Sequence, residues 1–243
     1  MPLLQAWLSE FGDSKWLLPA VALLIIVAVR SGTLPTRAAL RWVTAIAVTA
    51  AIVLASKLAF MGWGIGSARL DFTGFSGHAA MSAAIYPPLL VVLGSGRNLS
   101  RGGLVVAGLT WAGLIAASRL PLHAHTLSEV VSGFALGCAA TTFTMTGWSP
   151  TSRSLFILRW LAPAALVIAT LQFTAPNVST HKMVQTTAKT LSGRDKVYTR
   201  KWLHTRSANQ TQNIAKRLTS VDFRVNLIQL EQVLPPSGFQ EFP

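Results

Sequence analysis

The sequence has few charged residues and almost no cysteine. Only 12% of its 243 residues are charged, about half of the roughly 25% that is typical of soluble proteins. Hydrophobic residues make up 51% of the chain, and the mean hydropathy is +0.47. This composition argues against an ordinary water-soluble protein and against disorder of the whole chain. The single cysteine, Cys138, excludes an intramolecular disulfide framework and any metal cluster that needs several cysteines.

Acidic residues are also scarce, with 8 Asp and Glu against 21 Lys and Arg and a net charge of +13. The charge density changes along the chain, because residues 1–173 hold 15 charged side chains and the much shorter segment 174–243 holds 14. We therefore predict a membrane-embedded domain over 1–173 and a basic polar extension over 174–243. In so hydrophobic a chain, excess Lys and Arg indicates topology and contact with anionic lipid, so we expect membrane lipids as partners and no nucleic acid.

Six apolar stretches approach the length of about 20 residues that crosses a bilayer. They are Trp16–Val29, Trp42–Gly66, Ala79–Gly96, Gly102–Ser118, Val130–Ser152 and Trp160–Thr180. The predicted fold is an all-α, six-span transmembrane bundle. In the extension, alternation over Val221–Leu227 and a short apolar segment at Val197–Leu203 predict strands, and Ser207–Leu218 predicts a helix, so we expect a small α+β appendage.

The loops between these stretches differ in charge. Loops 31–41, 97–101 and 149–153, with the helix ends beside them, carry seven arginines and no acidic residue. Loops 61–78 and 119–129 carry both signs of charge and three histidines. The positive-inside rule places the arginine-rich loops in the cytoplasm and the histidine-bearing loops on the outer side. We expect a bacterial inner-membrane protein whose chemistry faces the periplasm.

The outward loops bring together residues that suit phosphoryl transfer. His125 and Glu129 are four residues apart, so on a helix they share one face. A carboxylate there would accept the proton of imidazole Nδ1 and leave Nε2 as a nucleophile or base. His78 comes from a different loop and would supply a proton to a leaving group.

Cationic and backbone groups complete this constellation. Lys57 and Arg119 provide fixed positive charge, and arginine suits bidentate contacts with phosphate. Ser76 and Gly77 precede an apolar stretch, where the N-terminal amides of a helix would point at an anion. Two histidines, a carboxylate, cations and a glycine at a helix start together indicate transfer of phosphate through a phosphohistidine.

These residues resemble the type 2 phosphatidic acid phosphatase (PAP2) superfamily of membrane lipid phosphatases. The third motif of that family, Ser-Arg-x5-His-x3-Asp, is matched by Ser118, Arg119 and His125, with Glu129 in place of the aspartate. The second, Pro-Ser-Gly-His, is matched by Ser76–His78 after a phenylalanine instead of proline. The resemblance covers roughly residues 16–173.

The first PAP2 motif, Lys-x6-Arg-Pro, is matched only by Lys57, because Gly64 stands where arginine is expected. Arg69 in the same outward loop is a candidate replacement. The longer side chain of Glu129 keeps the role of aspartate only if the local backbone shifts slightly. These departures are compatible with a different phosphate substrate, a slower enzyme or a degenerate one.

The resemblance implies a role for each residue. His125 would attack phosphorus, Glu129 would orient it, and His78 would protonate the leaving alkoxide. Lys57, Arg119 and the Ser76–Gly77 backbone would hold phosphate, with Ser118 adjacent and Arg69 as the replacement ligand. No metal or other cofactor is implied. The expected function is hydrolysis of a lipid phosphate or lipid pyrophosphate, and the alternatives are phosphotransfer between lipids or binding of lipid headgroups without catalysis.

Overall fold

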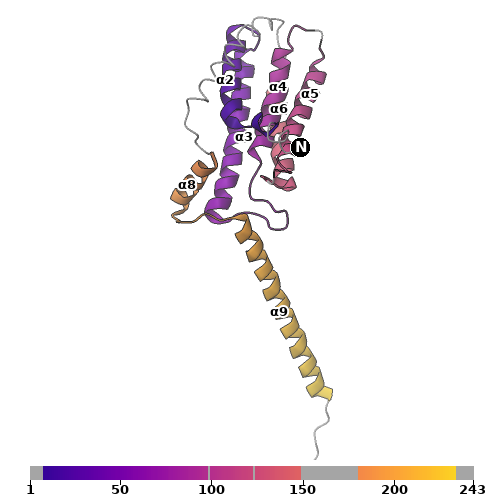
Figure 1. Ribbon diagram of the computed structural model, residues 1–243. Helices are drawn as coiled ribbons and strands as arrows, with labels where there is room; N and C mark the ends of the chain where they lie inside the picture. The colour runs from indigo at the N-terminus through magenta and orange to yellow at the C-terminus, as the bar shows by residue number, and fades with distance from the viewer. Residues whose placement is uncertain (1–7, 98, 123, 149–179, 234–243) are drawn as a thin grey trace, which may run out of the picture. The chain divides into compact units, whose positions relative to one another are not determined.

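The computed structural model describes residues 8–97, 99–122, 124–148 and 180–233, and these ranges are built from α-helices (Figure 1). The helices are α2 (Ser14–Arg30), α3 (Thr36–Trp63), α4 (Gly77–Leu93), α5 (Arg101–Ser118), α6 (Leu127–Met145), α8 (Thr180–Ser192) and α9 (Arg200–Val233). Helices α2 to α6 run up and down beside one another as a bundle, and α8 packs against α3.

Local sequence signals explain several of the helix ends. The Asp13 carboxylate caps α2 by accepting from the backbone N–H of Lys15 at 3.0 Å. The Ser100 hydroxyl caps α5 in the same way, accepting from the N–H of Gly103 at 3.1 Å. Helix α3 ends at Gly64, whose φ of 71° lies in the left-handed region that glycine adopts without steric cost. A loop that contains a bridge between Ser67 and Phe72 connects α3 to the start of α4.

Helix α4 is the centre of the bundle, because small residues let its neighbours approach closely. Ala79, Ala80, Ala83 and Ala84 are fully buried. On α6, a Cβ at Gly137 would lie 2.3 Å from the Ala80 carbonyl oxygen, so only glycine fits there. Gly133 and Gly137 are four residues apart, the spacing that brings apolar helices into backbone contact. This packing holds the first turns of α4 and α6 side by side.

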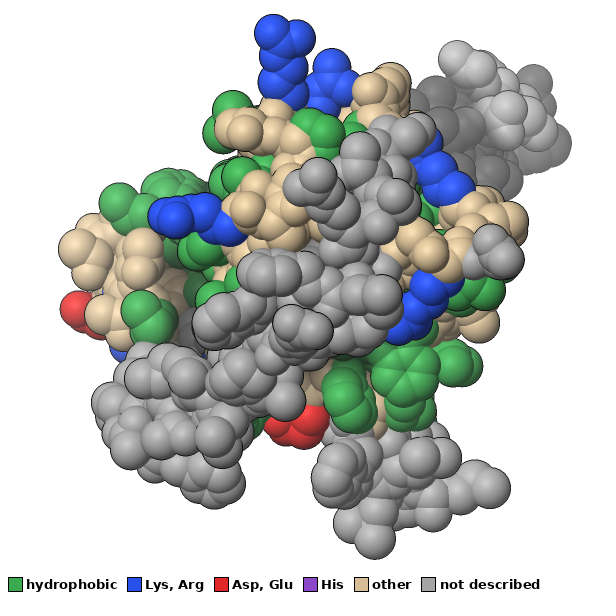
Figure 2. Space-filling view, turned by 90° about the horizontal axis from the view of Figure 1, so that it is seen from above, with side chains coloured by type: hydrophobic (Ala, Val, Ile, Leu, Met, Phe, Trp, Pro, Cys, Tyr) green, Lys and Arg blue, Asp and Glu red, His purple; other side chains and the backbone are tan. Residues whose placement is uncertain are grey.

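Arginines gather at the end of the bundle opposite those first turns. Figure 2 looks onto that end, where Lys and Arg side chains lie around the face. Arg41 of α3 donates to the carbonyl of Thr146 at 2.5 Å, and Arg101 of α5 donates to the carbonyl of Met145. Positive side chains here satisfy carbonyls at the C-terminal end of α6 and complement its dipole.

The six-span prediction is wrong for the described residues. Within them, only α3 and α5 are long and apolar enough to cross a membrane, by length and composition. Helix α4 is apolar but has 17 residues, which at about 1.5 Å per residue is shorter than a hydrocarbon core of about 30 Å. Helix α6 ends at Met145 instead of continuing to Ser152. The expected span at Trp160–Thr180 lies outside the described residues, apart from Thr180.

The α+β appendage is also wrong. Residues 180–233 contain α8 and α9 and no strand. The segment Val221–Leu227, which alternates like a strand, lies within α9, and Val197–Leu203 contains the start of that helix. The chain divides into two compact units, Met1–Tyr198 and Thr199–Pro243, so α9 belongs to the second unit. The candidate site residues described in the next subsection all belong to the first unit.

Candidate active site

The starts of α4 and α6 meet at the end of the bundle opposite Arg41 and Arg101. The backbone N–H of Ser76 donates to the carbonyl of Glu129 at 3.0 Å. A Cβ at Gly133 would lie 2.6 Å from the Ser76 carbonyl oxygen, so this approach requires glycine on α6. The structure thus joins the Ser76–His78 segment to the segment that carries His125 and Glu129, although about 50 residues separate them in the sequence.

His125 and Glu129 form the central pair of this site. The Nδ1 atom of His125 lies 2.7 Å from Oε2 of Glu129. The Glu129 side chain is 1% exposed and that of His125 is 14% exposed. A carboxylate only accepts hydrogen bonds, so Nδ1 carries the proton and Nε2 is left with its lone pair. This is the arrangement of a nucleophilic or basic imidazole.

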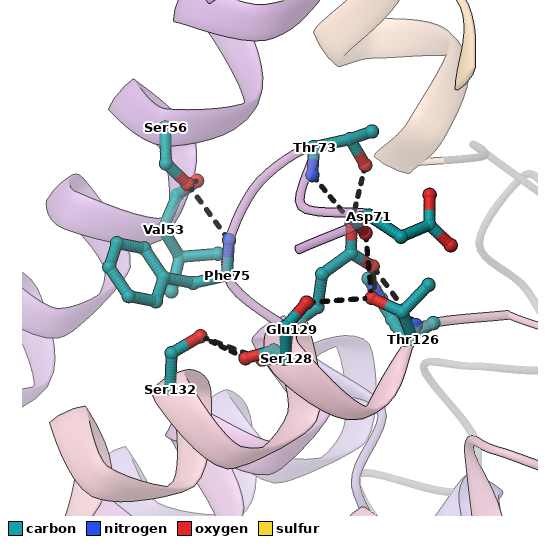
Figure 3. Close-up of polar contacts among 10 residues, drawn as sticks. Val53, Ser56, Asp71, Thr73, Phe75, Thr126, Ser128, Glu129 and Ser132 are labelled. Atoms are coloured by element: carbon teal, nitrogen blue, oxygen red, sulfur yellow. Dashed lines mark hydrogen bonds and ion pairs between the residues drawn. The ribbon is translucent and has the colours of Figure 1, made fainter. Parts of the chain in front are cut away.

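Two threonines that the sequence analysis did not select hold Glu129 in place (Figure 3). Oε1 of Glu129 accepts from the backbone N–H of Thr73 at 2.8 Å and from its hydroxyl at 2.5 Å. Oε2 accepts from the N–H of Thr126 at 3.3 Å. The Thr126-x-x-Glu129 spacing is that of a capping box, a local signal visible in the sequence. No local sequence signal points to Thr73, because it lies in the loop before α4 and is 56 residues from Glu129 in the sequence.

Two cationic side chains lie in the same part of the bundle as this pair. Lys57 lies on α3 within electrostatic range of Glu129 and Arg119. Arg119 follows the end of α5. His78, in the first turn of α4, lies within electrostatic range of Arg119, His125 and Lys57. Lys57, His78 and Arg119 therefore lie in the same part of the structure as His125 and Glu129.

The environment of His78 keeps it neutral. Burial, followed by the positive charge of Arg119, lowers the pKa of His78 from 6.5 to about 4, and Asp13 acts in the opposite direction. Near pH 7 the imidazole of the unliganded protein is therefore uncharged. An anion bound beside it would favour the protonated form.

Several buried polar atoms near His78 have no hydrogen-bond partner among the described residues. They are the hydroxyl oxygens of Ser76 and Ser82 and the Nε of Arg119. Buried polar groups are normally paired, so such atoms mark positions where a ligand or water is expected. Ser118 differs, because its hydroxyl donates to the carbonyl of Ile115 at 2.7 Å.

The segment before α2 covers this side of the site. Arg119 donates from Nη1 to the hydroxyl of Ser9, and the hydroxyl of Tyr86 donates to the carbonyl of Phe11 at 2.8 Å. A Cβ at Gly12 would lie 2.5 Å from Cγ2 of Ile115 and 3.1 Å from Cδ2 of His78. The backbone at Gly12 therefore lies directly against the His78 ring, a contact that nothing local in the sequence indicates.

Arg69 is not brought to the cluster in the same way. It is exposed on the turn closed by the bridge between Ser67 and Phe72, and no hydrogen bond or ion pair joins it to the described site residues. Among the residues that the structure describes, no group of three His, Cys, Asp or Glu side chains is placed to hold a metal ion.

Comparison with known proteins identifies a relative of this chain. No described protein family matches the chain, and no solved structure is similar to it. The chain is 39% identical over 202 residues to an uncharacterized 22.5 kDa protein in the cps region of Klebsiella pneumoniae, and the match covers 81% of this chain and 96% of the relative. Identity at this level over nearly the whole relative shows that the chain belongs to the same family as that protein.

Proposed function

We propose that the protein is a metal-independent phosphatase that removes phosphate from a lipid phosphate or lipid pyrophosphate through a phosphohistidine at His125. The observation that carries the proposal is the 2.7 Å contact between Nδ1 of His125 and the buried carboxylate of Glu129. This contact leaves Nε2 available for attack on phosphorus. The resemblance of Ser118–Glu129 and Ser76–His78 to PAP2 motifs supports the same chemistry.

The reaction has two steps. Nε2 of His125 forms a bond to phosphorus as the bond from phosphorus to the lipid oxygen breaks, and His78 gives its proton to the departing oxygen. Water then attacks the phosphohistidine with His78 as base, which breaks the P–N bond and releases inorganic phosphate. Glu129 stabilises the positive charge that develops on the imidazole of His125 in the first step.

Phosphate binding would itself prepare His78 for this role. Its pKa of about 4 leaves it neutral in the unliganded protein. A phosphate dianion held by Lys57, Arg119 and the first amides of α4 would offset the cations that depress this pKa. The substrate thereby favours the protonated His78 that the first step requires.

A lipid substrate fits the apolar surface of the first unit. Helices α3 and α5 are long and apolar enough to cross a membrane, by length and composition, and several of their large apolar side chains are exposed. These exposed residues include Leu40, Val43, Val48, Leu54, Val106 and Leu114. Figure 2 shows the arginine-bearing end of the bundle, where Arg41 and Arg101 contact the C-terminal end of α6, whereas Glu129 lies in its first turn. The positive-inside rule therefore supports an inner-membrane protein whose site faces the periplasm.

The test is release of inorganic phosphate by detergent-purified protein in EDTA. The lipid panel is phosphatidic acid, phosphatidylglycerophosphate and an isoprenyl pyrophosphate. We expect the wild-type protein to release phosphate from at least one lipid, His125→Ala to abolish the release, and His181→Ala, an exposed histidine of α8, to leave it unchanged. Release that persists in His125→Ala would contradict the mechanism.

Two other outcomes point to the alternatives. A labelled phosphate that appears on a second lipid only when an acceptor lipid is added would indicate phosphotransfer. Saturable binding of lipid without release of phosphate, by protein that retains its helical circular dichroism, would indicate a headgroup-binding protein.

A further inference from the structure

We propose that Thr73 is the positioning residue that enables a glutamate, in place of the aspartate of the PAP2 motif, to orient the nucleophilic histidine. The inference rests on the proposed function, and it adds a residue that belongs to none of the three motifs. Thr73 lies in the loop between α3 and α4, far in the sequence from the Glu129 that it holds.

The two oxygens of Glu129 have separate partners. Oε2 contacts Nδ1 of His125 at 2.7 Å and the N–H of Thr126 at 3.3 Å. Oε1 accepts from the N–H and the hydroxyl of Thr73 at 2.8 and 2.5 Å (Figure 3). Thr73 therefore fixes the oxygen that does not face His125, which sets the plane of the carboxylate.

A glutamate requires such a contact more than an aspartate does. Its side chain has one more rotatable bond, so more conformational freedom must be lost to hold the carboxylate at one angle. Glu129 is also fully buried, and a buried carboxylate is strongly destabilised unless donors surround it. Charge-assisted hydrogen bonds from Thr73 meet both requirements, because they are short, directional and stronger than neutral ones.

The loop that carries Thr73 is itself anchored on both sides. The N–H of Phe75 donates to the hydroxyl of Ser56 on α3 at 3.1 Å. The carbonyl of Asp71 accepts from the hydroxyl of Thr126 at 2.9 Å (Figure 3). Asp71 has a φ of 47°, an uncommon conformation for a residue other than glycine. These contacts fix the loop on both sides of Thr73 and so hold Thr73 beside Glu129.

The hydroxyl, not the shape of the side chain, is the feature that matters. Thr73→Val keeps the volume and removes the hydroxyl, whereas Thr73→Ser keeps the hydroxyl and removes a methyl group. We expect Thr73→Val to lower kcat by about 10- to 100-fold, the usual range for loss of a hydrogen bond to a charged group. KM should stay within about 2-fold, because Thr73 does not touch the substrate, and Thr73→Ser should restore most of kcat.

A double-mutant cycle tests the link to Glu129. In a Glu129→Asp background the carboxylate is too short to reach both His125 and Thr73, so adding Thr73→Val should lower kcat by less than about 3-fold. Equal losses in the two backgrounds would overturn the inference. Thr187→Val, on the exposed surface of α8, is the matched control for the substitution itself.

A measurement that needs no turnover separates this inference from the proposed function. In protein labelled with ¹⁵N-histidine, the ring nitrogens of His125, assigned by their loss in His125→Ala, report which nitrogen carries the proton. We expect protonation at Nδ1 in the wild-type protein and in Thr73→Ser, and a mixture of tautomers in Thr73→Val and Thr73→Ala. Unchanged ring signals in both hydroxyl-free variants would overturn the positioning role. If the ring signals change in the two hydroxyl-free variants while the wild-type protein hydrolyses no lipid, the result would support the positioning role and count against the phosphatase.

Discussion

The two sides of the candidate site differ in how far their polar groups are satisfied. On the side of His125 and Glu129, the proposed nucleophile side, Glu129 accepts hydrogen bonds from Thr73, Thr126 and His125. On the side of His78, the proposed acid side, the hydroxyl of Ser76 and the Nε of Arg119 are buried without partners among the described residues. One side is already organised before any ligand binds, and the other retains hydrogen-bonding capacity.

This difference has a physical meaning for phosphoryl transfer. The nucleophile must be correctly oriented before it meets phosphorus, because reorganisation during the reaction would raise the barrier. Phosphate-binding groups behave differently, since their partners arrive with the substrate. The contrast leads to four predictions, which run from the largest expected effect to the smallest.

Glu129→Gln should cause the largest loss, about 10³-fold or more in kcat. A glutamine amide can donate to Nδ1 of His125, which favours the tautomer whose Nε2 carries the proton and cannot attack. Steady-state release of phosphate measures the effect, and Asp195→Asn, an exposed acidic residue, serves as the control. A Glu129→Gln variant within 10-fold of the wild-type kcat would show that the nucleophile side is not organised by this carboxylate.

Acidification should destabilise the wild-type protein through His78. Because the folded-state pKa of about 4 lies below the unfolded value of 6.5, the unfolded chain binds the extra proton between these pH values. The free energy of unfolding that depends on neutral His78 is fully present above pH 6.5. It is lost as the pH falls to 4, a loss of up to about 3 kcal/mol. Thermal unfolding in detergent should show a smaller loss between pH 7 and 4 for His78→Gln, and parallel curves for the two proteins would contradict the prediction.

Arg119→Lys should lower kcat/KM by about 10- to 100-fold. A lysine keeps the charge but has no fork of N–H donors for bidentate contact with phosphate. Arg97→Lys, exposed at the opposite end of the bundle, is the matched control and should leave kcat/KM unchanged. If Arg119→Lys and Arg97→Lys give the same kcat/KM, Arg119 contributes only its positive charge. Its Nε–H, which has no partner among the described residues, then has no role in binding phosphate.

Gly12→Ala should have the smallest effect, a loss of about 1–2 kcal/mol in the free energy of unfolding. The added methyl group would lie 2.5 Å from Cγ2 of Ile115, so the segment before α2 must move away from His78. At Gly102 nothing lies within 4 Å of an added Cβ, so Gly102→Ala should leave the melting temperature unchanged or slightly higher. Equal melting temperatures for the two variants would contradict the close contact at Gly12.

Local spacing predicted part of this site and missed the rest. The spacing of four residues predicted that His125 and Glu129 share a helix face. The structure has them in contact, but His125 precedes the N-cap Thr126 and so lies outside α6. The contacts of Thr73 and Gly12 were not predictable, because each joins segments distant in the sequence. The predicted strand at Val221–Leu227 failed because period-2 alternation there coexists with helical spacing. That helical spacing runs through Ile214, Leu218, Val221, Val225 and Ile228.

The sequence by itself determined the apolar character of the chain, the positions of most helices in the bundle and the residue types available for phosphate chemistry, because these depend on composition and short-range periodicity. Only the tertiary structure decided the helix lengths that overturn the six-span prediction, and it alone brought Thr73 to Glu129 and the segment before α2 to His78. The physical reason is that such contacts depend on close backbone approach at Gly12 and Gly133, between segments whose separation no local pattern encodes.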